Sequence, residues 1–184
     1  MADVEYLKSL LTAHPDFPQK GIVFLDIFPI LRNPVAFETL VTNFVHHLNS
    51  KTVAQSSSKK IDVVVGLDAR GFLFGPIIAM RLGAAFVPVR KKGKLPGECV
   101  TATYEKEYGT DSFEMQADAI KPGQNVVVID DLIATGGSAK AAGELVAKCG
   151  GKTLEYLFII ELSFLKAAEK LDAPLYSLVQ VDDD

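Results

Sequence analysis

The sequence predicts an α/β fold in which helices flank a mostly parallel central sheet. Three apolar runs, residues 61–67, 84–89 and 126–129, each end in a charged or glycine-containing turn. Segments rich in helix-forming residues follow the first and third runs. Continuous apolar runs are typical of strands buried on both faces of a parallel sheet, and their alternation with helices indicates α/β architecture. Because the carboxyl ends of parallel strands meet at one edge of a sheet, we expect the three turns to lie together there.

The amino-terminal part predicts two helices separated by an irregular segment. Apolar side chains recur at helical spacing over residues 4–13, and the HPDFP string is expected to end that helix. Residues 21–31 are mostly apolar but carry Asp26 and Pro29, which favours an irregular strand or a covering loop. The second helix is expected to begin at residues 33–34, where an Asn-Pro pair precedes another apolar face.

The rest of the chain continues the alternation of strands and helices. Residues 49–60 are polar and predict a solvated connection, and the helix after the first run should end near Gly83. Residues 153–162 predict a further buried strand, residues 165–171 a short helix, and residues 174–181 a last strand.

Composition limits the classes of protein that the chain can represent. Its 184 residues suit one domain, with 48% hydrophobic and 23% charged residues as in ordinary globular proteins. A net charge of −4 weighs against a nucleic-acid partner. No apolar run approaches the roughly 20 residues that span a bilayer, and the amino terminus does not resemble a signal peptide. Cys99 and Cys149 form neither a metal-binding spacing nor a disulfide framework, which predicts thiols in a reducing, cytoplasmic compartment.

The third apolar run leads into two acids and a loop of small and hydroxyl residues. Such a loop suits a phosphate, because glycine lets the backbone approach closely and the following helix begins with unpaired N–H groups. Asp130 and Asp131 would repel a phosphate, so they are better suited to neutral hydroxyls, such as a ribose diol, near a magnesium ion. The loop residues are Thr135, Gly136, Gly137 and Ser138.

Two better-known phosphate motifs do not match this stretch. The loop has neither the GxxxxGK[ST] pattern of a P-loop nor a GxGxxG dinucleotide-binding pattern. The alternative interpretation is a strand end with solvated acids and a flexible turn.

Cations follow the other two predicted strands. Arg70 lies in the turn after the first run, and Arg90, Lys91 and Lys94 lie in the turn after the second. Several cations at one edge of the sheet could bind a pyrophosphate and stabilise it as a leaving group. A solvated basic loop is the alternative for the second turn.

Residues 97–116 show neither helical nor clean strand periodicity. This stretch carries Tyr104, Glu105, Glu107 and Tyr108, and a long segment of this kind is often an active-site lid. The surface of a β-hairpin would explain the same residues.

The string VVVIDDLIATGGS resembles the phosphoribosyl pyrophosphate (PRPP) signature of the type I phosphoribosyltransferases. That resemblance implies that Asp130 and Asp131 hold the ribose 2′ and 3′ hydroxyls. It also implies that the loop from Ala134 to Ser138 holds the 5′-phosphate.

Four further blocks resemble the adenine-specific branch of that family, in the family's order: residues 14–31, 66–75, 87–98 and 103–109. The resemblance implies one phosphoribosyltransferase domain over residues 1–184. Within it, residues 1–33 would form an amino-terminal base-binding hood and residues 95–116 a mobile catalytic loop. The implied reaction converts adenine and PRPP into AMP and pyrophosphate, as in purine salvage.

The same resemblance implies roles for individual residues. Glu107 would be the general acid or base, and Tyr108 would cover the ribose or the pyrophosphate. Arg70 would bind the pyrophosphate beside Ala69, which stands where a serine is common in the family. The residues implied to bind adenine are Val23, Phe24 and Leu25.

The resemblance also implies partners. Magnesium is expected to arrive with PRPP, because the sequence shows no set of ligands for a dedicated metal site. A homodimer is implied, with Lys94 able to reach the partner's site, and neither nucleic acid nor membrane is expected to bind.

Two alternatives stay open from the sequence. The acceptor could be hypoxanthine, guanine or another base, although the amino-terminal block argues against this. The chain could also be a PRPP-sensing regulator that binds DNA, but it lacks a basic face and a helix-turn-helix segment.

Overall fold

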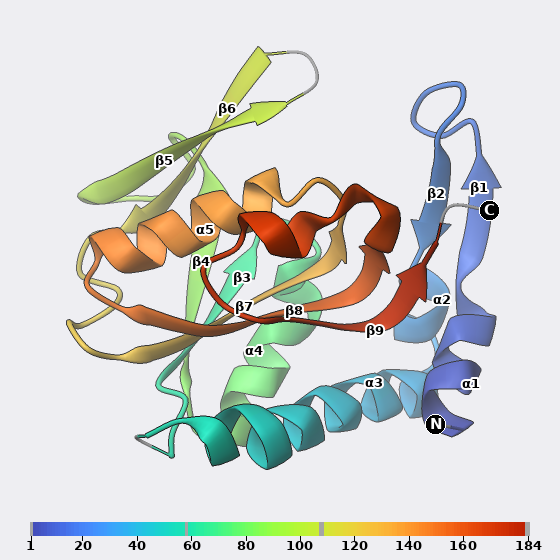
Figure 1. Cartoon of the computed structure of the whole chain (residues 1–184), viewed down its shortest axis with the longest axis horizontal. Helices are drawn as coiled ribbons and strands as arrows, with labels where there is room; N and C mark the ends of the chain where they lie inside the picture. The colour runs from blue at the N-terminus through green and yellow to red at the C-terminus, as the bar shows by residue number, and fades with distance from the viewer. Residues whose placement is uncertain (1, 58, 107–108, 183–184) are drawn as a thin grey trace. The chain divides into compact units, whose positions relative to one another are not determined.

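The computed structural model describes residues 2–57, 59–106 and 109–182, in two units, Met1–His46 and His47–Asp184 (Figure 1). The amino-terminal unit contains helix α1 (Ala2–Leu10), strands β1 (Thr12–Pro15) and β2 (Val23–Asp26), helix α2 (Phe28–Leu31) and most of helix α3 (Pro34–His47).

Strands β1 and β2 form an antiparallel hairpin in which Thr12 lies opposite Asp26. The first predicted helix is therefore too long at its end, because residues 12–13 pair with β2 instead of continuing the helix. The predicted start of the second helix is confirmed. The Asn33 side-chain oxygen accepts hydrogen bonds from the backbone N–H groups of Val35 and Ala36, at 3.1 and 3.2 Å, and so caps α3.

The larger unit is built on one sheet, whose described strands run in the order β5-β6-β4-β3-β7-β8-β9. The parallel strands are β3 (Val63–Leu67), β4 (Ala85–Lys91), β7 (Asn125–Ile133), β8 (Lys152–Leu162) and β9 (Leu175–Val181). Strands β5 (Cys99–Lys106) and β6 (Gly109–Gln116) add an antiparallel hairpin at the β4 edge. The predicted mostly parallel sheet is confirmed.

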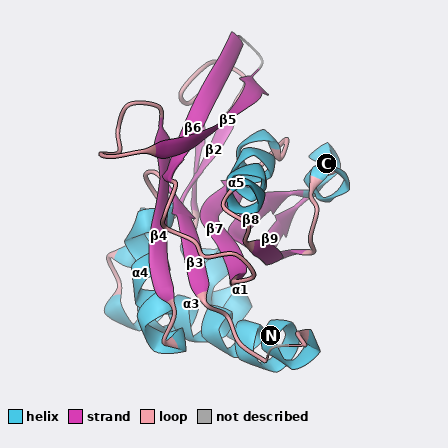
Figure 2. Cartoon of the chain, turned by 90° about the vertical axis from the view of Figure 1, so that its left-hand side faces the viewer, coloured by secondary structure: helices cyan, strands magenta, loops and turns pink. Residues whose placement is uncertain are grey.

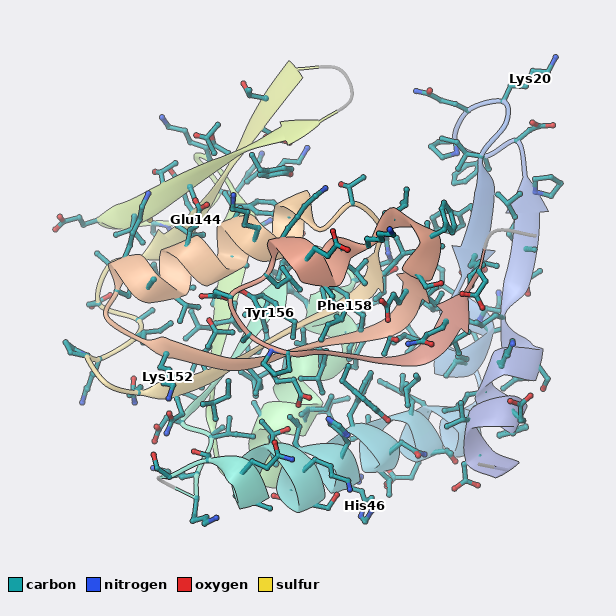
Figure 3. The ribbon with its side chains drawn as sticks, in the orientation of Figure 1. Lys20, His46, Glu144, Lys152, Tyr156 and Phe158 are labelled. Atoms are coloured by element: carbon teal, nitrogen blue, oxygen red, sulfur yellow. The ribbon has the colours of Figure 1, made fainter. Side chains whose placement is uncertain are left out.

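Helices α4 (Gly71–Leu82) and α5 (Gly137–Lys148) cover opposite faces of this sheet (Figure 2). As predicted, α4 ends at Gly83, which adopts the left-handed conformation that glycine allows. Tyr156 and Phe158 of β8 are at most 1% exposed and belong to the core that includes α5 (Figure 3). This core fixes the strands whose carboxyl ends carry the polar turns.

Three connections have a secondary structure that the sequence did not predict. Residues 49–57, 59 and 60 are exposed or half-buried, as predicted for a solvated connection. The first half of this connection is nevertheless helical, because the π-helix η1 (Leu48–Val53) continues α3 and places Thr52 against Glu155. The predicted short helix consists of two 3₁₀ turns, η2 (Ser163–Leu165) and η3 (Ala167–Lys170). Most of the stretch with no clear periodicity forms the β5–β6 hairpin. Among the described residues, no helix combines the length and hydrophobicity needed to cross a membrane.

Candidate active site

The carboxyl ends of β3, β4 and β7 surround a cavity of about 330 Å³. The turns after β3 and β7 form much of its wall, and the β5–β6 hairpin contributes Tyr104 and Phe113. The predicted site residues in the lining are Arg70, Lys91, Asp130, Asp131, Ala134, Thr135, Gly136, Gly137 and Ser138. The expectation that these strand-end turns gather at one edge is therefore confirmed.

The two acids at the end of β7 have different surroundings. Asp131 is 3% exposed, and its carboxylate forms an ion pair with the Arg70 guanidinium. Asp130 Oδ1 is buried and has no hydrogen-bond partner among the described residues. A buried carboxylate oxygen without a partner is costly, because it has lost its hydration and gained nothing in exchange. This oxygen is therefore the atom in the wall most in need of a ligand donor.

The surroundings of Asp130 also change its protonation. Burial of the carboxyl, together with the negative charge of Asp131, raises the pKa of Asp130 from 3.8 to about 8. Backbone hydrogen bonds from Asp131 and Gly71 and the charge of Arg70 oppose this shift without cancelling it. Asp130 therefore holds its proton more tightly than an ordinary aspartate, beside an Asp131 that is paired with Arg70.

Replacing Asp130 by asparagine is expected to remove a pH dependence of stability, measured without PRPP. A carboxyl whose pKa rises from 3.8 to about 8 on folding stabilises the fold most at low pH. It loses that contribution as the pH rises through about 8, because the folded state alone holds the proton. Asparagine resembles the protonated acid at every pH. Melting temperatures of the two proteins at several pH values check this, and a pH-independent difference would contradict it.

The loop after β7 has the geometry of an anion-binding turn. Gly136 has a φ of +82°, which glycine adopts at little cost, and it precedes the first residue of α5. No side chain caps this end of α5 within the described residues. The first N–H groups of the helix, at the positive end of its dipole, are thus available to an anion in the cavity that Gly137 and Ser138 line.

The cations after β4 do not all reach the cavity. Lys91 lines it, and its Nζ lies 3.2 Å from Asp111 Oδ2. Arg90 lies outside the described lining: its Nε donates to Asp68 Oδ2 at 2.8 Å, and its Nη1 donates to the Lys94 carbonyl at 3.1 Å. Successive residues of a strand point to opposite faces, which separates these neighbours. Lys94 is exposed and likewise lies outside the described lining.

Two residues near the cavity were missed at the level of sequence. Asp68 lines the cavity and pairs with Arg90. It stands in the same polar turn as Arg70, so its place after a predicted strand could have marked it as a site residue. Lys170 donates from Nζ to the Thr135 carbonyl at 2.8 Å, and no sequence motif marks it. The peptide between Asp68 and Ala69 is cis.

The remaining predicted site residues are not among the described residues that line this cavity. Val23, Phe24 and Leu25 form β2 in the amino-terminal unit, where the Phe24 ring contacts Phe17 edge to face at a centroid distance of 5.3 Å. Glu107 and Tyr108 fall outside the described residues.

Comparison with known proteins identifies the family of the chain. The family model described as the phosphoribosyl transferase domain matches residues 40–182. An adenine phosphoribosyltransferase of Yarrowia lipolytica is 58% identical over 173 residues, which is 94% of this chain and 93% of that protein. The chain belongs to the adenine phosphoribosyltransferases of the type I phosphoribosyltransferase family.

Solved structures agree with the fold of this phosphoribosyltransferase. The adenine phosphoribosyltransferase of Saccharomyces cerevisiae, solved with adenine and an imino-altritol bisphosphate, has a TM-score of 0.92 at 54% identity. That comparison covers 96% of this chain and 98% of the other. The enzyme from Thermoanaerobacter pseudethanolicus has a TM-score of 0.90 at 44% identity, covering 97% and 99%. The chain is thus an enzyme that transfers the 5-phosphoribosyl group of PRPP to adenine, giving AMP and pyrophosphate.

Proposed function

We propose that PRPP binds in the 330 Å³ cavity, with its 5′-phosphate on the loop of residues 134–138 and its ribose diol on the two acids. The observation that carries this placement is the convergence of an anion-binding turn and two unlike acids on one cavity. Charged Asp131 accepts a hydrogen bond from a hydroxyl, and Asp130 Oδ1 gains the partner it lacks. Competition between ribose 5-phosphate and PRPP tests the placement, and its absence would contradict it.

The cavity then holds the ribose between its phosphate and the cations. A nitrogen of adenine attacks C1′ while the bond from C1′ to the pyrophosphate oxygen breaks, with inversion through an oxocarbenium-like state. Alignment of the two reactants can contribute about 7–11 kcal/mol toward the barrier. Arg70 and Lys91 stabilise negative charge growing on the leaving group, and Asp131 lies near the positive ribose. Arg90 and Lys94 extend this cationic edge outside the described lining.

Binding of pyrophosphate requires the cations to exchange partners. Arg70 is held by Asp131, Arg90 by Asp68 and Lys91 by Asp111. Each pair holds a cation in place before the substrate arrives, and each can transfer donors to phosphate oxygens.

Magnesium suits this site as an ion that PRPP carries. The cavity offers the carboxyl oxygens of Asp130 and Asp131, and magnesium prefers such donors together with substrate phosphates and water. Over residues 2–57, 59–106 and 109–182, no group of three or more His, Cys, Asp or Glu side chains could hold a metal. Bound with PRPP, magnesium would neutralise charge on the leaving pyrophosphate. Turnover measured with and without the ion tests this assignment.

Glu107 is proposed to take the proton of the attacking imidazole edge of adenine, with Tyr108 covering the reacting groups. The proposal rests on the match of TYEKEYG to the family. Changing Glu107 to glutamine should lower kcat about 10²-fold or more, the scale of general base catalysis, while PRPP affinity changes little. Single-turnover rates and equilibrium PRPP binding check the two halves separately. An unchanged kcat would contradict the proposed role of Glu107 as a general base. The neighbouring Glu105→Gln enzyme is the matched control.

We further propose that the segment Val23–Leu25 reads adenine through its backbone groups, within a base-binding hood of residues 1–33. Residues 95–116 would act as a mobile catalytic loop, and residues 1–184 as one phosphoribosyltransferase domain. Substitutions at Phe24 test the base site: they should change the KM for adenine, and an unchanged value would contradict the assignment.

The assembly and location are proposals of the same kind. The family supports a homodimer, in which Lys94 reaches the partner's site, and light scattering of the purified enzyme tests the dimer. The thiols of Cys99 and Cys149, neither in a disulfide, support a cytoplasmic location, which cell fractionation tests.

A further inference from the structure

The loop of residues 134–138 rests on the η3 segment, which lies between β8 and β9. Lys170 Nζ donates a hydrogen bond to the Thr135 carbonyl oxygen at 2.8 Å. Ala167 is 1% exposed and lies close to Gly136: a Cβ on Gly136 would lie 3.1 Å from Ala167 Cβ and 3.3 Å from its carbonyl oxygen. The loop therefore has a close contact and a charged hydrogen bond on the same segment.

The hydrogen bond from Lys170 determines the orientation of one peptide group in the loop. The Thr135–Gly136 peptide is trans, so its carbonyl and its N–H point in opposite directions. Lys170 holds the carbonyl on its own side, which leaves the Gly136 N–H on the other side. A rotated peptide would direct a carbonyl oxygen at a bound phosphate and repel it. Lys170 thus favours the one orientation of this peptide that suits an anion.

We propose that Lys170 is a positioning residue for the 5′-phosphate and acts through the Thr135–Gly136 peptide. This inference rests on the proposed function, because it takes the loop to be the 5′-phosphate site. Lys170 touches the loop and not the reacting atoms, so it sets affinity for the phosphate end of PRPP. Its contribution should be absent from pyrophosphate binding, since the cations that serve pyrophosphate follow β3 and β4.

Lys140 provides a matched control for charge. Lys140 and Lys170 both line a second cavity of about 440 Å³, together with Thr135 and Gly137. The Lys140 side chain comes from α5, whereas the Lys170 side chain holds the Thr135 carbonyl. Removing either lysine lowers the local positive charge by the same amount, but only one removal releases the carbonyl.

The test is calorimetric titration of ribose 5-phosphate and, separately, of pyrophosphate into wild type, Lys170→Met, Lys170→Arg and Lys140→Met. We expect Lys170→Met to bind ribose 5-phosphate about 5–10-fold more weakly. This loss is near the lower limit of the free energy of a charged hydrogen bond, because Lys170 is exposed to solvent. Pyrophosphate affinity and kcat at saturating PRPP should stay within about twofold. Lys170→Arg should restore most of the affinity, and Lys140→Met should resemble wild type.

Several results would overturn the inference. Unchanged ribose 5-phosphate binding in Lys170→Met would show that the Thr135–Gly136 peptide keeps its orientation without the hydrogen bond from Lys170. Equal losses of ribose 5-phosphate affinity in Lys170→Met and Lys140→Met would assign the effect to the removal of positive charge. If Lys170→Met also lost affinity for pyrophosphate, the substitution would have disturbed the fold as a whole. If Lys170→Met does not fold, Lys170→Gln keeps a neutral donor and should show a smaller loss. Failure of ribose 5-phosphate to compete with PRPP in wild type would instead contradict the proposed function itself.

Discussion

Replacing Asp131 by asparagine is expected to lower kcat/KM for PRPP by about 10²-fold or more. The carboxylate is 4% exposed in its side chain and pairs with Arg70, so the change affects the diol site and a cation at once. Removing one partner of a buried, hydrogen-bonded charge pair costs about 2–5 kcal/mol. Arg70 is 40% exposed, which keeps the loss from its side near the low end of that range.

Asparagine keeps the shape of Asp131 but places an amide where the diol needs acceptors. Loss should therefore appear in PRPP affinity as well as in kcat, because the hydroxyls are bound in both the ground state and the transition state. The measurement is a steady-state series with PRPP varied at saturating adenine, accompanied by equilibrium PRPP binding.

Asp62→Asn is the matched control for this experiment. Asp62 pairs with Lys60 at 2.9 Å and accepts the Asn125 N–H at 2.9 Å, next to the amino-terminal ends of β3 and β7. The substitution removes the same charge at the opposite end of the strands and should leave kcat/KM within about twofold. Equal activity of the two variants would exclude Asp131 from the PRPP site.

The polar residues at the strand ends could be predicted from the sequence, because their positions depend on short stretches of the chain. Apolar runs fix where β3 and β7 lie, and parallel pairing then brings Arg70, Asp130 and Thr135 to one edge whatever the side-chain details. The TGGS loop likewise needs only its own backbone and the start of α5. Fold class and much of the cavity wall follow from these short-range facts.

Contacts between distant segments could not be predicted in the same way. Asp130 and Asp131 are adjacent and identical, yet one pairs with Arg70 while the other keeps a buried oxygen without a described partner. Lys170 reaches Thr135 across 35 residues, and its own neighbours give no sign of that role. The lid-like segment lacked periodicity, but pairing of β5 with β6 makes it a hairpin. In each case tertiary contacts outweigh local preference.

Gly143 is another residue whose role depends on a contact with a distant segment. It lies in an alanine-rich helix, where glycine is less favourable than alanine by about 1 kcal/mol on propensity alone. The structure gives the reason for glycine: a Cβ there would lie 1.9 Å from the Tyr156 hydroxyl oxygen. Tyr156 is fully buried, and its hydroxyl donates to Asp172 Oδ1 at 2.6 Å. Burial and this bond raise the pKa of Tyr156, so the hydroxyl stays a donor.

Gly143→Ala is expected to destabilise the enzyme by about 2–4 kcal/mol despite its gain in helix propensity. Overpacking costs about 1–3 kcal/mol, and a buried hydroxyl displaced from its partner costs about 1–3 more. For a chain of this size the melting temperature should fall by roughly 5–15 °C. Thermal unfolding at one fixed protein concentration measures the shift, because concentration affects any oligomer.

Tyr156→Phe separates the steric cause from a general intolerance of alanine in α5. Without the hydroxyl, the nearest ring atom is Cζ, 3.1 Å from the position of the new Cβ, and a small shift relieves that contact. Adding Gly143→Ala to Tyr156→Phe should therefore cost less than about 1 kcal/mol, and the double-mutant cycle should show strong coupling. Additive losses would mean that the alanine disturbs α5 independently of Tyr156. The glycine would then serve the packing of the helix as a whole, and the hydroxyl would have room to move.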